Sequence, residues 1–461
     1  MAQARDFTRG SVLPKRVSLA LPIMGTAFIQ MAYSLADYFW IGHEGSGAMT
    51  AVGAAGIYLW FANALTTITK TGAEVTIAQA LGVKDMHLGY RYARHALILS
   101  LVFGLVVGAL LLALHRPLIG FYSIRALETV GQGERYLRIV ALGVPFTFLN
   151  ATYFGLYNGF GYSRTPFIAN SIGLLLNVIL DPILIRGYLG IPRLGVAGAA
   201  YATVLAQGVV LLIVVVANMR PGARFHHLLR GFRPDVGFMR RLLVLGMPVG
   251  VQNALFSVIG MVIARLVTRW GDMGVGVQSI GAQIEAITWM TAGGFSSALA
   301  SYTGQNFSAC RFKRIHQGYV RTLLLMGGVS VLASVLFIAW GKQLFSVFMP
   351  EPQAAAEGGR YLRIMGFSQL FMVLEILAVG VLNGMGRTLP PAVVGVTFNV
   401  LRIPLSLWWG SYALQGIWWA ITVSSICKGS LLTLLLFRAV RRVPRALRRA
   451  SRGVGGYKKS G

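Results

Sequence analysis

The chain has 461 residues, of which 55% are hydrophobic and only 12% are charged. Because soluble domains carry about 25% charged residues, this composition excludes a soluble globular protein and predicts an integral membrane protein. The formal net charge of +28 could indicate a nucleic-acid partner, so the positions of the basic residues decide what it means.

Twelve segments are apolar over enough residues to cross a bilayer as helices. A hydrocarbon core about 30 Å thick needs about 20 helical residues. In chain order the predicted spans are 17–41, 50–80, 94–114, 136–159, 165–187, 194–218, 241–268, 279–303, 319–340, 361–384, 389–410 and 413–438. The predicted fold class is therefore all-α integral membrane, with twelve transmembrane helices.

If the N-terminus is assumed to be cytoplasmic, basic residues concentrate in the connections on the cytoplasmic side. With that orientation, 28 of the 42 Lys and Arg residues lie on the inner side, as the positive-inside rule requires. We therefore expect a multi-pass protein of the cell (inner or plasma) membrane with both termini cytoplasmic. The basic tail RAVRRVPRALRRASR is explained as an anchor for anionic lipid, and no nucleic-acid partner is expected.

One unit of six spans occurs twice in the chain. YLRI at 136–139 recurs at 361–364, and YNGFGYSRTP at 157–166 matches LNGMGRTLPP at 382–391. Six is an even number, so both copies start on the same side and form a parallel pseudo-twofold repeat, an arrangement common in transporters. The predicted domains are an N-lobe at 1–219, a cytoplasmic linker loop at 220–239, a C-lobe at 240–440 and a basic cytoplasmic tail at 441–461.

Two intramembrane carboxylates belong to one copy only. Asp37 aligns with Ile263, and Asp181 aligns with Ile403. A structural requirement of the six-helix unit would be expected in both copies, so the asymmetry favours a functional role for these acids.

The predicted depth of Asp37 is similar to that of Asp181. Each lies one to two turns below the outer end of its span, and Asn177 is one turn deeper than Asp181 on the same face. Thr203 and Tyr136 reach this outer region from two further spans. An unpaired ionised carboxylate there is costly, so it tends to hold a proton or a cation. The pair could exchange a proton near neutral pH, and the oxygens of Asp37, Asn177, Asp181 and Thr203 suit Na⁺ equally well.

Most of these residues also have a structural explanation. Asp181 precedes a proline and could shape a helix kink. Asn177 and Tyr136 each have a counterpart in the second copy, which suggests a shared structural role, and Thr203 could bond to its own helix.

Two opposite charges lie at mid-depth in the second copy. Glu375 and Arg402 are on different spans and could form an ion pair within the C-lobe. A charge swap that restores activity lost in either single mutant would support this pair.

Five motifs stand out along the chain. They are Pro22 with Asp37, Asn177-x-x-x-Asp181-Pro182, GVAGAAYAT at 195–203, IGAQIEAITWM in the second half, and GQNFSA after it. With these motifs the chain resembles the multidrug and toxic compound extrusion (MATE) family, and is most similar to its DinF-like prokaryotic branch. The resemblance covers nearly the whole chain.

The resemblance implies two six-helix lobes around a central cleft and export of cationic or amphiphilic compounds in exchange for H⁺ or Na⁺. It implies an N-lobe cation network made of Asp37, Tyr136, Asn177, Asp181 and Thr203. Pro22 would be the bend point of the first helix, and Gln30 and Asn150 would face the drug. Met31 would contribute to an adaptable apolar wall. One departure is Ser308, which stands in GQNFSACR where the family usually has a glycine.

We therefore expect a cation-coupled multidrug efflux antiporter that works by alternating access. A flippase or exporter of lipid-linked or amphiphilic lipids is the alternative, with Arg402 as the main candidate for binding a pyrophosphate. An enzyme is not expected, because H-E-x-x-H, G-x-S-x-G and phosphate-loop motifs are missing. The expected partners are small-molecule drugs and membrane lipids; no cofactor besides the coupling ion and no second subunit is expected.

Overall fold

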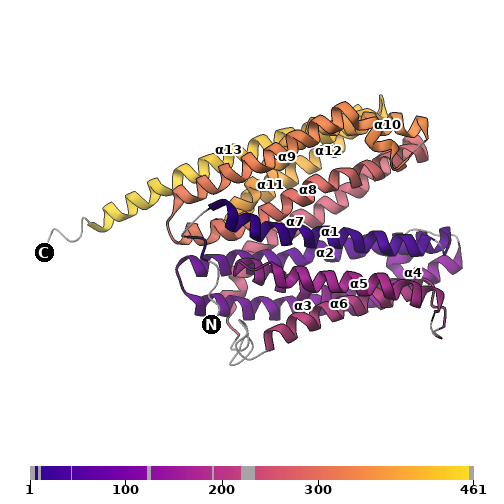
Figure 1. The fold of residues 1–461 in the computed structure, drawn as a ribbon, viewed down its shortest axis with the longest axis horizontal. Coiled ribbons are helices and arrows are strands. Elements are labelled where there is room, and N and C mark those ends of the chain that lie inside the picture. Colours follow the sequence, from indigo (N-terminus) through magenta and orange to yellow (C-terminus); the bar gives the residue numbers. More distant parts are fainter. Residues whose placement is uncertain are drawn as a thin grey trace. The chain divides into compact units, whose positions relative to one another are not determined.

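The computed structural model describes residues 6–8, 12–42, 44–121, 126–188, 190, 192–219, 234–349 and 351–455. Over these residues the protein consists of helices and short connections, without a strand (Figure 1). The elements are α1 (Val12–Gly42), α2 (Ser46–Gly82), α3 (Met86–Gly120), α4 (Leu127–Gly159), α5 (Arg164–Arg186), α6 (Val196–Met219), α7 (Val236–Val267), the 3₁₀ helix η1 (Thr268–Trp270), α8 (Gly271–Ser308), α9 (Phe312–Ser346), α10 (Pro352–Gly366), α11 (Gln369–Gly384), α12 (Leu389–Trp409) and α13 (Leu414–Gly455).

Every predicted span corresponds to one helix or, at 361–384, to a bent pair of helices, which confirms the predicted all-α membrane fold. By length and hydropathy, nine helices in the described part of the chain qualify as membrane spans, or ten when α10 and α11 are counted as one bent span. The remaining two predicted spans correspond to α1, which is apolar over its segment Val17–Tyr33, and α8. The helix α8 is more polar because it carries Gln278, Gln283 and Glu285.

The span predicted at 361–384 is broken into two helices. α10 and α11 meet at an angle of 49°. At the break, the Ser334 hydroxyl of α9 donates to the Gly366 carbonyl at 2.8 Å. This bond satisfies a carbonyl that the end of α10 leaves without a helical partner.

The chain divides into two compact units, which we call the first and the second unit. The first contains Ser18–Ser257, and the second contains Val258–Gly461 together with Phe7–Val17. The divisions fall inside α1, between Val17 and Ser18, and inside α7. Residues 220–233 of the predicted linker loop and 456–461 of the predicted tail lie outside the described residues, so the predicted domain boundaries stay a prediction. The helix α13 continues to Gly455 and includes most of that tail.

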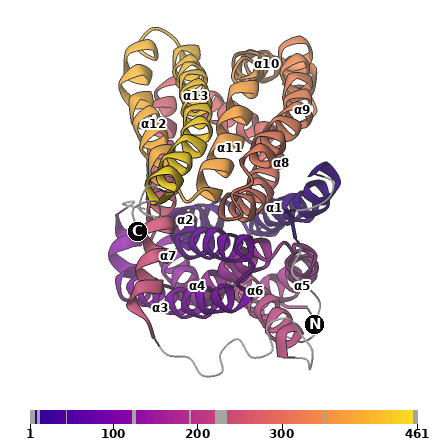
Figure 2. The same cartoon turned by 90° about the vertical axis from the view of Figure 1, so that its left-hand side faces the viewer.

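Neighbouring helices are arranged in the same way within each unit (Figure 2). In the first unit α4 packs against α2, α3 and α6; in the second unit α11 packs against α8, α9 and α13. The closest approaches are equivalent as well. Gly155 of α4 lies against the Lys70 carbonyl of α2, and Gly380 of α11 lies against the Ser296 carbonyl of α8. The predicted sequence repeat is thus also a repeat of helix contacts.

The GQN motif at the end of α8 holds the start of the chain. The Gln305 Oε1 atom accepts a hydrogen bond from the Phe7 amide at 2.8 Å, and the Phe7 side chain is completely buried. Ser308 is the last residue of α8. The turn that follows has its positive φ at Cys310 (54°), the equivalent of Lys84 (61°) in the first unit.

Gly155→Ala is expected to lower the stability of the protein by about 1–3 kcal/mol, because a Cβ at this position would overlap the backbone of α2. The matched control is Gly53→Ala in α2, where a Cβ would meet no atom within 4 Å. Thermal unfolding of the purified variants in detergent measures the difference. Equal unfolding midpoints for the two variants would contradict the close packing of α2 and α4.

Candidate functional site

Two carboxylates from different helices meet in the first unit. Asp37 lies near the end of α1, and Asp181 lies in the last two turns of α5. The Asp37 carboxylate is within hydrogen-bonding reach of the Asp181 and Asn177 side chains. The Thr203 hydroxyl of α6 donates to Asp37 Oδ2 at 3.4 Å, and Asn177 Nδ2 donates to Asp181 Oδ1 at 3.4 Å. Four of the five predicted ion-site residues are therefore in contact.

The oxygens of this group are buried and incompletely paired. Asp181 and Asn177 are 0% exposed. Asp37 Oδ1, Asp181 Oδ2 and Asn177 Oδ1 are buried acceptors without a hydrogen-bond donor among the described residues. A buried acceptor left unpaired costs about 1–3 kcal/mol, and more when it is charged. A proton or a cation bound between these oxygens would remove this cost.

The chemistry of the group fits a proton or Na⁺. A proton shared by two adjacent carboxylates removes their mutual repulsion. Na⁺ prefers oxygen ligands, and Asn177 and Thr203 add amide and hydroxyl oxygens to the two carboxylates. No cluster of three or more His, Cys, Asp or Glu side chains occurs within the described ranges, so a cation held here would need these neutral oxygens as well.

Tyr33 belongs to this group and was missed in the sequence analysis. It lies four residues before Asp37 on α1, is 7% exposed and interacts electrostatically with Asp37. Its hydroxyl is buried without a hydrogen-bond partner in the described structure. The i, i+4 spacing places both side chains on one helix face and would have identified it.

Tyr136 is buried at the same end of the first unit. It packs in an apolar cluster with Ile41 and Ile185, which follow Asp37 and Asp181 by four residues each. Its predicted role as a cation ligand stays a prediction.

The residues predicted to face the drug differ in exposure. On α1, Gln30 is exposed and Met31 is half-buried. Asn150 of α4 is 2% exposed, and its amide donates to the Gln207 carbonyl at 3.0 Å and to Gln207 Oε1 at 2.9 Å. The helix α1 continues through Pro22 as one element. Drug binding by these side chains and bending at Pro22 stay predictions.

In the second unit, Glu375 has a different ion-pair partner from the predicted one. Its Oε1 atom lies 2.9 Å from Lys428 Nζ of α13. Arg402 instead donates from Nε to the Ser424 hydroxyl at 2.7 Å and from Nη2 to the Ser425 hydroxyl at 2.9 Å, and it interacts electrostatically with Glu375. The predicted pair is corrected to Glu375–Lys428, because similar depth does not determine which faces of two helices meet.

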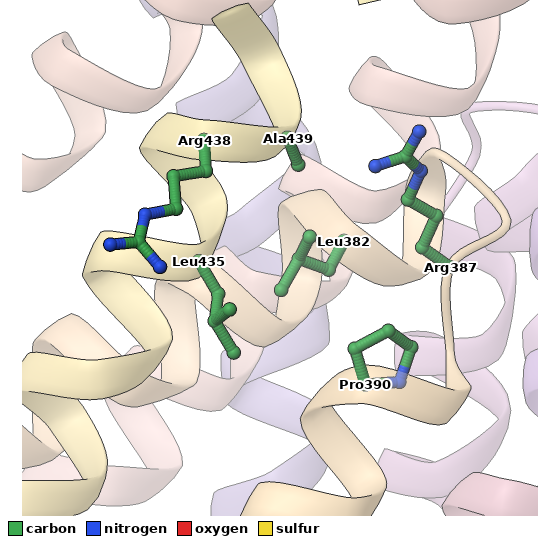
Figure 3. Close-up of a pocket in the computed structure, with 6 residues that line it drawn as sticks. All are labelled: Leu382, Arg387, Pro390, Leu435, Arg438 and Ala439. Atoms are coloured by element: carbon green, nitrogen blue, oxygen red, sulfur yellow. The ribbon is translucent and has the colours of Figure 1, made fainter. Parts of the chain in front are cut away.

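A cavity of about 190 Å³ lies in the second unit, where α11, α12 and α13 come together (Figure 3). Arg387 and Arg438 stand on opposite sides of it, with apolar side chains between them. The lining residues are Leu382, Arg387, Pro390, Leu435, Arg438 and Ala439. The cavity belongs to a different unit from the carboxylate pair, so it is not part of the candidate cation site.

A model of the MatE family matches residues 22–183 and matches a second time at residues 248–408. Together the two matches cover more than half of the chain, and each falls in one copy of the repeat. The first match contains Asp37, Asn177 and Asp181, and the second contains Glu375 and Arg402.

Similar proteins have names that refer to multidrug resistance. The chain is 27% identical to the probable multidrug resistance protein NorM of Thermotoga maritima over 91% of each chain. It is 25% identical to the multidrug resistance protein PmpM of Pseudomonas aeruginosa over 95% of this chain and 94% of that protein. A crystal structure of a MATE protein in complex with MaD5 superposes with a TM-score of 0.87 at 21% identity, over 96% of this chain and all of that one.

Proposed function

Because the chain belongs to the MatE family of transporters, we propose that it is a multidrug efflux antiporter that exports cationic or amphiphilic compounds in exchange for H⁺ or Na⁺. Two of its relatives are named as multidrug resistance proteins. The observation that carries the coupling mechanism is the contact between Asp37 and Asp181. One buried oxygen of each, Asp37 Oδ1 and Asp181 Oδ2, lacks a donor among the described residues.

The coupling ion would act by changing the contact between α1 and α5. When Asp37 and Asp181 are both ionised, they repel each other; a proton or Na⁺ between them holds the two helices together. A ligand shifts a conformational equilibrium only through its different affinity for the two states. The cation therefore favours the state in which α1 and α5 are in contact, and its release favours the other state.

Pro22 supplies the place where α1 can change shape. A proline inside a helix removes one backbone hydrogen bond and commonly allows a bend. Rearrangement of α1 about Pro22 would move Gln30 and Met31 together with Asp37, because all three follow Pro22 on the same helix. Ion binding and drug release are thereby coupled through one element.

The protein is a multi-pass membrane protein, and we propose that it lies in the plasma membrane with both termini in the cytoplasm. The bias of Lys and Arg toward the predicted inner side supports this orientation. The cavity between Arg387 and Arg438 would then face the inner leaflet. Its two guanidinium groups suit the phosphate of an anionic lipid, and its apolar side chains suit the first part of the acyl chain.

Dye efflux in inverted membrane vesicles tests the proposed function. A pH gradient and a Na⁺ gradient are imposed separately, and the transport of a cationic dye is followed by fluorescence. We expect one gradient to drive transport and its collapse by a proton or Na⁺ ionophore to stop it. Vesicles without the protein are the control, and dye transport that needs neither gradient would contradict ion-coupled antiport.

The lipid-flippase alternative is weakened by the contacts of Arg402. A site for a pyrophosphate needs basic groups with donors available to the ligand. The Nε and Nη2 donors of Arg402 are used by Ser424 and Ser425, and Lys428 is held by Glu375. Flipping of a fluorescent lipid-linked saccharide in proteoliposomes, without dye export, would favour the alternative.

A further inference from the structure

The second unit contains a buried cluster of two acids and two bases. Lys428 Nζ is held by Glu375 Oε1 at 2.9 Å and by Asn399 Oδ1 at 3.2 Å. The Lys428 side chain is 6% exposed and that of Glu375 is 12% exposed. Arg402 interacts electrostatically with Glu285 as well as with Glu375. Each carboxylate of the cluster therefore has a cation that the chain itself supplies.

The sequence repeat shows which residues of the first unit are equivalent to Glu375 and Lys428. Glu375 is equivalent to Asn150, and Lys428 is equivalent to Gln207 when GVAG at 195–198 is aligned with GIWW at 416–419. The structure supports this alignment, because the following residue in each helix, Gly208 or Gly429, lies against an equivalent phenylalanine of α4 or α11. The amide pair Asn150–Gln207 at 2.9 Å is thus replaced by an ion pair in the second unit.

The surroundings of the two pairs also correspond. Asn399, which binds the Lys428 ammonium, is the equivalent of Asn177, which contacts both carboxylates of the first unit. Ser424 is the equivalent of Thr203. Thr203 donates to Asp37, whereas Ser424 accepts from Arg402. In the first unit these polar residues surround acids, and in the second unit they surround bases.

The two units therefore differ in their charge balance. Asp37 and Asp181 interact with each other and with neutral side chains, and neither has a Lys or Arg ion-pair partner among the described residues. Glu285 and Glu375 face Arg402 and Lys428. An acid held in a low-dielectric region requires a counter-charge, which can be a free ion or a basic side chain. In the first unit the counter-charge is left to a free ion. In the second unit the side chains of Lys428 and Arg402 supply it.

We propose that Lys428 and Arg402 are tethered cations that fill a latent cation site in the second unit, formed by Glu375, Glu285 and Asn399. Cation exchange is thereby confined to the first unit. The consequence that each chain has one coupling site rests on the proposed function. The latent site itself is a property of the second unit and does not depend on that function. Removing the ammonium of Lys428 should open that site to a free cation.

The test measures Na⁺ binding by the full-length protein in lipid nanodiscs, with choline as the replacement ion. Asp37→Asn is used as the background, so that the first unit does not contribute. In this background, Lys428→Met is expected to raise saturable binding of ²²Na⁺ from none to about one ion per chain, and to make the unfolding temperature rise with Na⁺ concentration. Adding Glu375→Gln is expected to remove both effects, and Lys428→Arg is expected to produce neither.

Three outcomes would overturn the proposal. They are no Na⁺ binding by the Lys428→Met variant, Na⁺ binding that persists when Glu375→Gln is added, and equal binding by Lys428→Arg. If Glu375 and Lys428 form only a structural ion pair, the Lys428→Met variant should not bind Na⁺, because the unpaired Glu375 would take up a proton instead.

A second measurement covers the case in which Lys428→Met does not fold. In Lys428→Ala, added n-butylammonium is expected to raise the unfolding temperature, and Glu375→Gln is expected to abolish this rescue; an absence of rescue would also overturn the proposal. The comparison is made with and without Glu375→Gln in one background, so its result does not depend on whether Asp37 couples transport. Failure of the proposed function would instead appear as dye transport that needs neither a pH gradient nor a Na⁺ gradient.

Discussion

Asp37→Asn is expected to leave a folded, membrane-inserted protein whose gradient-driven dye efflux is reduced at least about tenfold, the effect of losing about 1.4 kcal/mol of coupling. The amide has nearly the shape of the carboxylate and can keep the contact with Thr203. It cannot bind and release a proton, and it holds Na⁺ less strongly because it carries no charge. The contact between α1 and α5 then no longer depends on the ion.

Initial rates of dye efflux in inverted vesicles measure this effect, with expression and detergent gel filtration as checks of folding. Glu128→Gln is the matched control, because Glu128 is an exposed acid of the same unit outside the candidate site. It should retain efflux. Wild-type efflux in the Asp37→Asn variant would reject a coupling role for Asp37, whatever the control shows.

Glu375→Ala is expected to destabilise the second unit by about 3–5 kcal/mol, since it leaves the Lys428 ammonium buried without its carboxylate. Replacing both charges, as in Glu375→Met with Lys428→Met, should restore much of the stability. Two apolar side chains of similar volume leave no uncompensated charge in the same space.

Thermal unfolding of the purified variants measures this difference, and the double variant serves as the reference for the single one. The pair Arg360–Glu357, at 2.6 Å and with Arg360 61% exposed, is the control: Arg360→Ala should change stability by less than about 1 kcal/mol. A double variant as unstable as Glu375→Ala would show that the charges matter for a reason other than their mutual compensation.

The first unit could be read from the sequence to a large extent, because a transmembrane helix constrains the positions of its residues strongly. Each span must cross the same thickness, so the distance of a residue from the end of its span determines its depth. Asp37, Asp181 and Thr203 are predicted at similar depth with Asn177 one turn deeper, and the structure brings the four side chains together. The asymmetry of the repeat identified the two acids before any contact was known.

Depth alone does not determine which side chains meet, and the second unit shows this clearly. Glu375 and Arg402 lie at similar depth, but α13 presents Lys428 to Glu375 and two serines to Arg402. The rotation of a helix about its axis depends on packing with its neighbours, such as the approach of Gly429 to the backbone at Phe371. A span that is apolar on most sides carries little information about that rotation.

The sequence by itself determined the membrane class, the twelve spans, the repeat and the two unmatched acids, since these follow from local hydrophobicity and from comparison of the two halves. Only the tertiary structure decided the partners between helices: Asn150 bound to Gln207, and Lys428 between Glu375 and Asn399. Such contacts join helices that are far apart in the chain. Their geometry depends on the packing of whole helix faces, which no single span encodes.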